Sequence, residues 1–451
     1  MTTRFHLFSA SQRLCGIKRF YHQWNNRYRK NGLKTRGGAQ TTFMEKQDRR
    51  TILVLCLVPL IMVLGNSMLI PVLPAIKKAL RVNLSQVGLL ITVFSVPAGI
   101  VIPFAGLLSD RIGRKKILAP ALIVYGLGGI LAGLAGVLVK ESYRLILGAR
   151  IIQGIGAGGT YQVAMALAGD EIQGKERAQA LGYLEASNGL GKVISPLAGA
   201  ALASIGWQIP FFVYGASAIP IAAAVYWLAG EKKPGAEAQQ TLGQYFKGFA
   251  SLWRQKGAAL AGAFLAGMTV LFTLFGILSF FSDVLEKKYQ IQVFGRGLLL
   301  AIPMLLMAVT SFVLGLMLKR KPASLMRPCT FAGMSCVAGG LALFTLLPLT
   351  KGRLLLPLLA TAIVGLGTGA TLPPINALIT SAAPREERGG LTCLYGAVRF
   401  FGVAMGPPVF ALGMQGVKVP LYLGIAAGVA LIGLLALFLI KPQQVLPQNM
   451  L

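Results

Sequence analysis

Twelve apolar runs, each close to 20 residues long, constrain this chain of 451 residues more than any other feature. About 20 apolar residues in an α-helix match the hydrocarbon thickness of a bilayer. Backbone groups within hydrocarbon must bond inside their own segment, and the period-two alternation of a membrane barrel is absent, so we predict helices. The runs cover 52–75, 87–109, 117–137, 144–168, 179–203, 209–229, 258–282, 294–318, 327–348, 354–378, 391–412 and 420–440.

The composition leads to the same fold class. Hydrophobic residues make up 55% of the chain and charged residues only 13%, too few polar side chains to cover a soluble protein of this length. The sequence therefore predicts an all-α integral membrane protein that crosses the bilayer twelve times.

Basic residues are in large excess, with a formal net charge of +30. If the N-terminus is cytoplasmic, the short loops expected inside carry about twice as many Lys and Arg residues as those expected outside. This bias predicts a multi-pass protein of the plasma (inner) membrane with both termini in the cytoplasm. It assigns the basic charge to topology and to contact with anionic lipids, not to nucleic acid.

A faint internal repeat and the polar segments divide the chain. Aligning the prolines of the fifth and eleventh runs superposes Gly191 on Gly402. Such a duplication predicts two pseudo-symmetric six-helix bundles with a site between them. The expected parts are a basic arm at 1–50, an N-terminal bundle at 51–229, a cytoplasmic linker at 230–257 with an interfacial helix near 245–253, a C-terminal bundle at 258–440 and a cytoplasmic tail at 441–451.

The arm has no acidic residue before Glu45, and we expect it to be disordered. An acid-free, Arg-rich start resembles an organelle transit peptide. The segment from Met44 onward resembles a natural bacterial N-terminus, so we favour a wrongly assigned start codon, with residues 1–43 not translated, over a targeting segment.

A dense cluster of charge separates the second and third runs, in Gly106-Leu-Leu-Ser-Asp-Arg-Ile-Gly-Arg-Lys-Lys-Ile-Leu118. Charge packed so closely must leave the hydrocarbon and form a loop. The segment resembles the signature loop of the major facilitator superfamily, at Gly106, Asp110, Arg111, Gly113 and Arg114. The resemblance implies the major facilitator fold, and a contact of Asp110 with the start of the eleventh helix, where a carboxylate is favoured.

The fourth run contains Arg150-Ile-Ile-Gln153-Gly-Ile-Gly, which resembles the helix-4 motif of the same superfamily. A guanidinium group in a membrane is costly and is retained where it faces water or a partner. The resemblance implies that Arg150 assists proton transfer or anchors the site. A side chain that merely reaches the membrane surface is the alternative.

The fifth run carries Gly182, Gly191, Ser195, Pro196 and Gly199. This series resembles the motif of the family's proton-coupled exporters, and it points to the 12-helix drug:proton antiporter branch. Small residues allow close helix packing, and proline bends the helix. Ser195 departs from the glycine of the motif.

Glu185 is the only acidic residue expected inside a span, and Lys192 follows seven residues later on the same helical face. An isolated charge within the membrane is expensive and often functional. We predict that Glu185, Lys192 and Arg150 form the proton-coupling group. A static ion pair that fixes helix packing is the alternative.

Five polar residues are expected to line a central cavity: Asn66, Gln153, Asn188, Asn376 and Arg399. Asn66 stands roughly where the helix-1 motif of many drug exporters has an acid. Any proton carrier must therefore lie elsewhere, and Glu185 is the candidate.

These features predict a proton-coupled secondary active exporter of small amphipathic compounds that works by alternating access. The excess of basic residues in the spans leaves open an exporter or flippase of an anionic or lipid-headgroup substrate. A non-transporting scaffold would have no use for the signature loop.

No enzyme is predicted, because the sequence shows no nucleophile–base set, metal cluster or phosphate loop. We expect no cofactor and no metal: the five cysteines form no CxxC pair, and both histidines lie in the arm. The expected partners are a small-molecule substrate, protons and the lipid bilayer, with the protein a monomer.

Overall fold

A computed structural model describes residues 46–172, 175–231, 242–320, 322–346, 354–383, 388–413 and 418–442. Most of the predicted arm, the middle of the predicted linker and the tail from residue 443 onward lie outside the described residues. The domain boundaries proposed in those segments stay predictions.

Every regular element of the described residues is helical. The elements are α2 (Lys46–Ser67), η1 (Ile70–Val72), α3 (Leu73–Leu80), α4 (Leu84–Ile112), α5 (Arg114–Leu138), α6 (Tyr143–Gly158), α7 (Tyr161–Glu171), α8 (Lys175–Ala203), α9 (Ile209–Leu228), α10 (Leu242–Lys287), α11 (Val293–Arg320), α12 (Pro322–Leu346), α13 (Leu355–Ala382), α14 (Arg388–Leu412) and α15 (Lys418–Leu439).

The twelve predicted spans correspond to these elements. Ten helical stretches of the described residues are long and apolar enough to cross a membrane, one of them formed by α2, η1 and α3 together. The other two passes are α6 with α7, and α8. The predicted all-helical fold with twelve membrane passes is thereby confirmed.

Two predicted spans are broken where single helices were expected. In the first, a 3-10 turn at Ile70–Val72 separates α2 from α3, and Pro71 and Pro74 lack the N–H groups that a continuous helix would use. In the fourth, α6 ends at Gly158 and α7 begins at Tyr161. The amide of Gly159 donates instead to the carbonyl of Gly156, which tightens the end of α6.

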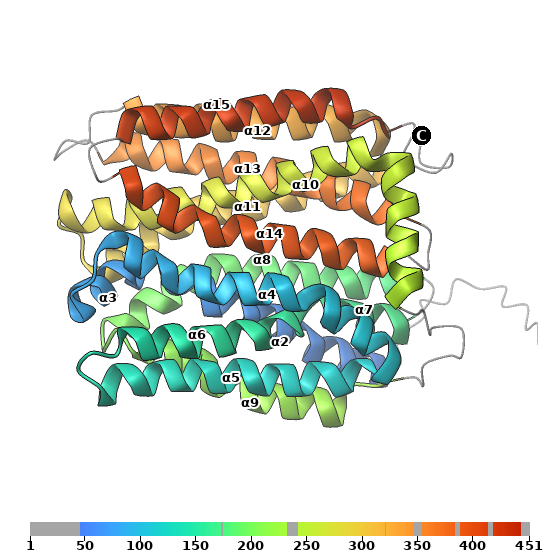
Figure 1. The fold of residues 1–451 in the computed structure, drawn as a ribbon, viewed down its shortest axis with the longest axis horizontal. Coiled ribbons are helices and arrows are strands. Elements are labelled where there is room, and N and C mark those ends of the chain that lie inside the picture. Colours follow the sequence, from blue (N-terminus) through green and yellow to red (C-terminus); the bar gives the residue numbers. More distant parts are fainter. Residues whose placement is uncertain are drawn as a thin grey trace, which may run out of the picture. The chain divides into compact units, whose positions relative to one another are not determined.

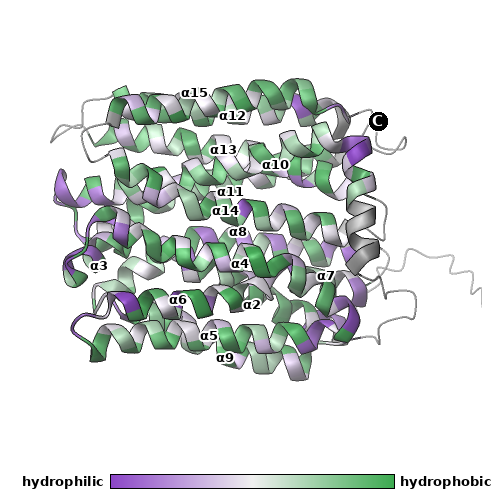
Figure 2. Ribbon diagram, viewed as in Figure 1, coloured by the Kyte–Doolittle hydropathy of each residue, from purple (hydrophilic) through white to green (hydrophobic). Residues whose placement is uncertain are grey.

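The helices lie side by side along most of their lengths (Figure 1). Hydrophobic residues cover their flanks, and hydrophilic residues gather at both ends of the bundle (Figure 2). Large apolar side chains are exposed on the outside, among them Phe104, Trp227 and Phe438. Such exposure would be costly in water, and it provides the lipid-facing surface of a membrane protein.

Glycines that the internal repeat superposes pack against equivalent helices in the two halves. In the first half, a Cβ atom at Gly191 of α8 would lie 3.4 Å from the carbonyl oxygen of Leu60 of α2. In the second half, a Cβ atom at Gly402 of α14 would overlap the carbonyl oxygen of Met268 of α10. Helices α8 and α14 therefore approach α2 and α10 as the internal repeat predicts.

Helix α10 begins inside the segment predicted as a linker. Its first part crosses the ends of other helices, and the remainder runs along them (Figure 1). The residues expected to form a separate interfacial helix, 245–253, are thus the start of α10.

Candidate functional site

A cavity lies between the two halves of the bundle. Helices α2, α4, α7 and α8 line it from the first half, and α10 and α14 line it from the second. It contains about 620 Å³ of empty space, part of which is open to solvent. The lining residues are Met62, Val63, Asn66, Ser67, Phe94, Tyr161, Gln162, Asn188, Lys192, Leu271, Phe275, Gly396, Arg399, Phe400 and Val403.

Four of the predicted site residues line this cavity. Asn66 and Asn188 are buried, while Lys192 and Arg399 are partly exposed to it. The guanidinium carbon of Arg399 lies 5.4 Å from the centre of the Tyr395 ring, within the range of a cation–π contact. The structure therefore brings basic side chains from both halves to one cavity.

Glu185 approaches the same cavity through Tyr161. The Tyr161 hydroxyl donates a hydrogen bond of 2.6 Å to the carboxylate of Glu185, and Tyr161 is a lining residue. Glu185 itself is exposed, and it lies about two turns before Lys192 along α8. A carboxylate is thus held beside the cavity, within the membrane-spanning part of the bundle.

Arg150 is fully buried in the first half, where it joins three helices. Its guanidinium group donates to the carbonyl oxygens of Leu90 at 3.0 Å and Gly65 at 2.8 Å. It also donates to the side-chain oxygens of Gln153 at 2.7 Å and Asn66 at 2.9 Å. These bonds satisfy the charge inside the protein and fix α6 against α2 and α4.

The contacts of Arg150 determine how Asn66 can act. Its carboxamide oxygen accepts from Arg150, and its nitrogen donates to the Ser95 hydroxyl at 3.1 Å. Gln153 is fully buried and is not among the residues that line the cavity. Asn188, which was predicted for the cavity, and Lys192, which was predicted for proton coupling, both line the cavity and can meet a ligand there.

Asn376 lies on α13 and is partly exposed, away from the residues that line the cavity. Its backbone carbonyl accepts a hydrogen bond of 2.9 Å from the Thr380 hydroxyl. Pro373 and Pro374 lie in the preceding turn of the same helix.

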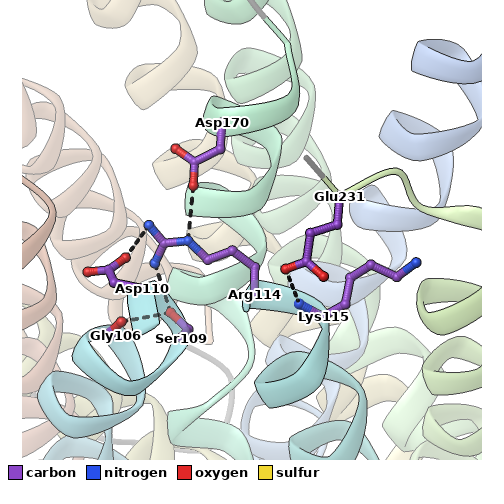
Figure 3. Close-up of polar contacts among 7 residues, drawn as sticks. All are labelled: Gly106, Ser109, Asp110, Arg114, Lys115, Asp170 and Glu231. Carbon is purple, nitrogen blue, oxygen red and sulfur yellow. Dashed lines mark hydrogen bonds and ion pairs between the residues drawn. The ribbon is translucent and has the colours of Figure 1, made fainter. Parts of the chain in front are cut away.

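The residues of the signature loop form one polar cluster at the junction of α4 and α5 (Figure 3). Arg114 forms an ion pair with Asp110, one turn earlier in the chain. It also contacts Asp170 of α7, with 3.0 Å between Nε and Oδ2, and donates to the Ser109 hydroxyl at 2.8 Å. The cluster therefore connects α4, α5 and α7 at one end of the bundle.

Gly113 and the residue after Arg114 complete this junction. Gly113 has a φ angle of +111°, a left-handed conformation that favours glycine. This conformation accounts for the glycine between Arg111 and Arg114 in the motif. The backbone N–H of Lys115 donates to Glu231 at 3.1 Å (Figure 3), and its side chain donates to the carbonyl of Ala229 at 2.8 Å. Lys115 thus caps the C-terminus of α9.

Gly106 allows α4 to contact α14 of the other half. A Cβ atom there would lie 2.8 Å from the sulfur of Cys393, which is buried. Arg111 is exposed at the surface. The proposed contact of Asp110 with the start of α14 stays a prediction.

The predicted helix-5 motif lies along α8 in two different environments. Gly191 and Gly199 pack against residues of the first span, and Pro196 contacts α11 of the other half, its carbonyl oxygen lying 2.6 Å from where a Cβ atom of Gly297 would be. Ser195 is fully buried. Gly182 has no atom within 4 Å of its would-be Cβ.

These contacts distinguish the two ends of the bundle. We call the end of the bundle that holds the signature loop the loop end, and the end that holds α3 the opposite end (Figure 1). Toward the opposite end, the Pro196 contact is joined by Gly88 of α4, whose Cβ would lie 3.3 Å from Pro407 of α14. Toward the loop end, Gly182 of α8 and Gly315 of α11 would each meet open space. Helices α8 and α11 are thus in close contact toward the opposite end, at Pro196 and Gly297, whereas α4 and α14 are in contact toward both ends, at Gly88 and at Gly106.

The sequence analysis missed one acidic residue. Asp283 was expected just beyond a span, but α10 continues to Lys287, and the Asp283 side chain is fully buried. It forms an ion pair with Lys77 of α3. The two residues are 206 positions apart, so no local pattern could have joined them.

Comparisons with known proteins agree with this geometry. The sequence profile of the Major Facilitator Superfamily matches residues 55–407. The chain is 40% identical over 364 residues to the bacillibactin exporter of Bacillus subtilis (strain 168), covering 80% of this chain and 89% of the relative.

Two further proteins resemble the chain over most of its length. It is 26% identical over 403 residues to multidrug resistance protein 1 of Bacillus subtilis (strain 168), covering 86% of this chain and 96% of the relative. The fold matches a bacterial homologue of the human lysosomal transporter Spinster, solved in an inward-facing, unoccupied conformation. That match has a TM-score of 0.67 at 18% identity and covers 89% of this chain and 96% of the other.

Proposed function

Because the chain belongs to the Major Facilitator Superfamily, and so is a transporter of small molecules and not an enzyme, we propose that it is a proton-coupled exporter. Its cargo would be a small amphipathic organic compound. The relatives named as an exporter and as a multidrug resistance protein support the direction of transport and this class of cargo.

The observation that carries the proposal is the position of Glu185. Its carboxylate accepts a hydrogen bond from Tyr161, which lines the cavity between the halves. In an antiporter, a carboxylate at such a position is stabilised by hydrogen-bond donors when it is ionised and binds a proton in the other state. It changes between these two states as the cavity opens to one side of the membrane and then to the other. The Glu185 side chain is exposed on α8, and we propose that a proton reaches it from the cavity beside Tyr161.

Protonation of Glu185 changes the net charge of the cavity and its surroundings, where Lys192 and Arg399 are cationic. When Glu185 is ionised, the cavity carries two cationic side chains and one carboxylate nearby. When Glu185 is protonated, the cationic charge of the cavity rises by one unit. The proton thereby changes the affinity of the cavity for charged cargo. Arg150 takes part indirectly, by fixing Asn66 on the cavity wall.

Export would proceed by alternating access. We propose that cargo enters from the loop end, and that the contact of α8 with α11 near Pro196 and Gly297 keeps the opposite end closed. The positive-inside bias of the sequence supports a cytoplasmic location for the loop end and for both termini. We further propose that the protein works as a monomer in the plasma (inner) membrane. Each proton that returns across 100 mV supplies ~2.3 kcal/mol for export.

A second candidate function is export of an anionic or lipid-headgroup substrate. The charge of the cavity favours it, because Lys192 and Arg399 line the cavity and no acidic residue is among its fifteen lining residues. Apolar side chains such as Phe94 and Phe275 would contact the hydrocarbon part of such a compound. A cation would meet net repulsion there.

Two xanthene dyes of similar shape and opposite charge distinguish the candidates. Inverted membrane vesicles from a pump-deficient bacterial host that expresses the chain would be energised and supplied with carboxyfluorescein or rhodamine 123. Uptake of the anionic dye that disappears in Lys192→Ala supports the anionic substrate. Uptake of the cationic dye, unchanged in Lys192→Ala, supports the general amphipathic exporter. Growth tests against a panel of toxic compounds, with and without Glu185→Gln, then identify further cargo.

A further inference from the structure

We propose that Lys77 and Asp283 form a latch that closes the substrate pathway at the opposite end of the bundle. Lys77 belongs to α3 of the first half and Asp283 to α10 of the second, and their side chains form an ion pair. The side chain of Asp283 is 0% exposed and that of Lys77 is 13% exposed. This ion pair therefore joins the two halves.

The latch lies between the cavity and the opposite end. Phe275 lines the cavity about two turns before Asp283 on α10, and Ser67 lines it just before the break that leads to η1 and α3. Any substrate that leaves the cavity in this direction must pass the place where α3 and α10 are joined. Separation of Lys77 from Asp283 is therefore part of opening this end.

Asp283 has a second partner that would remain after the latch opens. The Nζ atom of Lys287 lies 3.2 Å from the other carboxylate oxygen of Asp283, one turn further along α10. A buried carboxylate left without a partner is strongly destabilised. Because Lys287 moves with Asp283, the carboxylate stays paired in both conformations, which allows the contact across the halves to be reversible.

The surrounding charges give a matched control. Glu286 of α10 and Arg296 of α11 form an ion pair of 3.1 Å next to Asp283, but both belong to the second half. Loss of the Glu286 charge removes this ion pair and weakens a longer-range attraction to Lys77, but it leaves the ion pair between the halves in place. A role of Asp283 in local packing alone would make the two acids equivalent.

Lys77 lies on a short helix, α3, which the turn η1 separates from α2. α3 contains eight residues, follows the 3-10 turn η1, and ends at Arg81 in a left-handed conformation with a φ of 53°. It can therefore change its contact with α10 through the turns at its two ends, while α2 keeps its packing on α8. The latch does not depend on the identity of the cargo or on proton coupling, so it goes beyond the proposed function and can be tested separately.

Distance measurements between spin labels test the latch in the purified protein without any substrate. Lys78→Cys on α3 and Gln292→Cys near the start of α11 are exposed positions on either side of the latch, and native cysteines are replaced by serine. In Asp283→Asn and in Lys77→Met, we expect the population with a long separation to increase by about tenfold, the effect of losing one hydrogen bond to a charged group. In Glu286→Gln, the shift of the distance distribution should be much smaller, because the ion pair of Lys77 with Asp283 remains.

The double variant Lys77→Asp with Asp283→Lys distinguishes loss of the ion pair from misfolding of the single variants. It restores opposite charges across the halves and should return the distances toward those of the wild type. An unchanged distribution in Asp283→Asn and Lys77→Met would overturn the latch. An equal shift in Glu286→Gln, or failure of the swapped pair to reverse the shift in folded protein, would also overturn it.

Discussion

Replacement of Gly199 by alanine should destabilise the protein, while the same replacement at Gly182 should not. Both glycines lie on α8 and belong to the predicted helix-5 motif. A Cβ atom at Gly199 would overlap the carbonyl oxygen of Met68 and lie 2.5 Å from its Cγ atom, closer than the 3.0 Å that real Cβ atoms keep. A Cβ atom at Gly182 would meet nothing within 4 Å.

The two substitutions differ by a calculable amount. Alanine in place of glycine favours a helix by about 1 kcal/mol, and this gain applies at both positions. The overlap at Gly199 is with backbone that cannot rotate away, so it adds a cost of about 3 kcal/mol, the upper part of the range for overpacking. We expect Gly199→Ala to lose about 2 kcal/mol and Gly182→Ala to gain about 1 kcal/mol.

Thermal unfolding in detergent, followed by the fluorescence of the four tryptophans, measures the difference. Because the entropy of unfolding grows with chain length, a gap of about 3 kcal/mol in a chain of 451 residues corresponds to melting temperatures that differ by roughly 3 °C. Equal melting temperatures for the two variants would show that α8 does not approach the first span as described. The clash also displaces the break after α2, beside Ser67, so transport should fall in Gly199→Ala alone.

Three further substitutions test other contacts. Arg150→Met should cost about 3–5 kcal/mol in the same melting experiment, because it leaves four buried acceptors without their donor, and Arg150→Lys should cost less. Arg114→Ala should change stability by less than about 1 kcal/mol, since its partners Asp110 and Asp170 are exposed, yet it should slow efflux from cells. Tyr161→Phe removes the hydrogen-bond donor to Glu185 and should slow gradient-driven uptake into energised inverted vesicles, with a loss of stability of no more than about 1.5 kcal/mol in the melting experiment.

The helical spans could be predicted from sequence because the bilayer fixes both their length and their polarity. The breaks within the first and fourth spans could not be predicted in the same way. Pro71 and Gly159 also occur within continuous membrane helices, where neighbouring groups satisfy the backbone. Only the packing of the neighbouring helices decides whether such a residue bends a helix or ends it.

The candidate site was partly predictable for a related reason. Glu185 and Lys192 share a helical face, so their spacing alone places them together. The partner of Asp283 lies in another half of the molecule, and its helix is longer than hydropathy suggested. The contacts of Arg150 with backbone carbonyls are equally invisible to sequence, because any residue type can supply a carbonyl.

The role of Glu185 is the central claim of this account, and uptake into proteoliposomes tests it most directly. A cargo identified by the growth panel is supplied with a pH gradient and again after an ionophore has dissipated the gradient. We predict that the wild type concentrates the cargo only with the gradient. Glu185→Gln should retain exchange of cargo across the membrane but equilibrate it to equal concentrations under both conditions. Gradient-driven accumulation by Glu185→Gln would contradict the account.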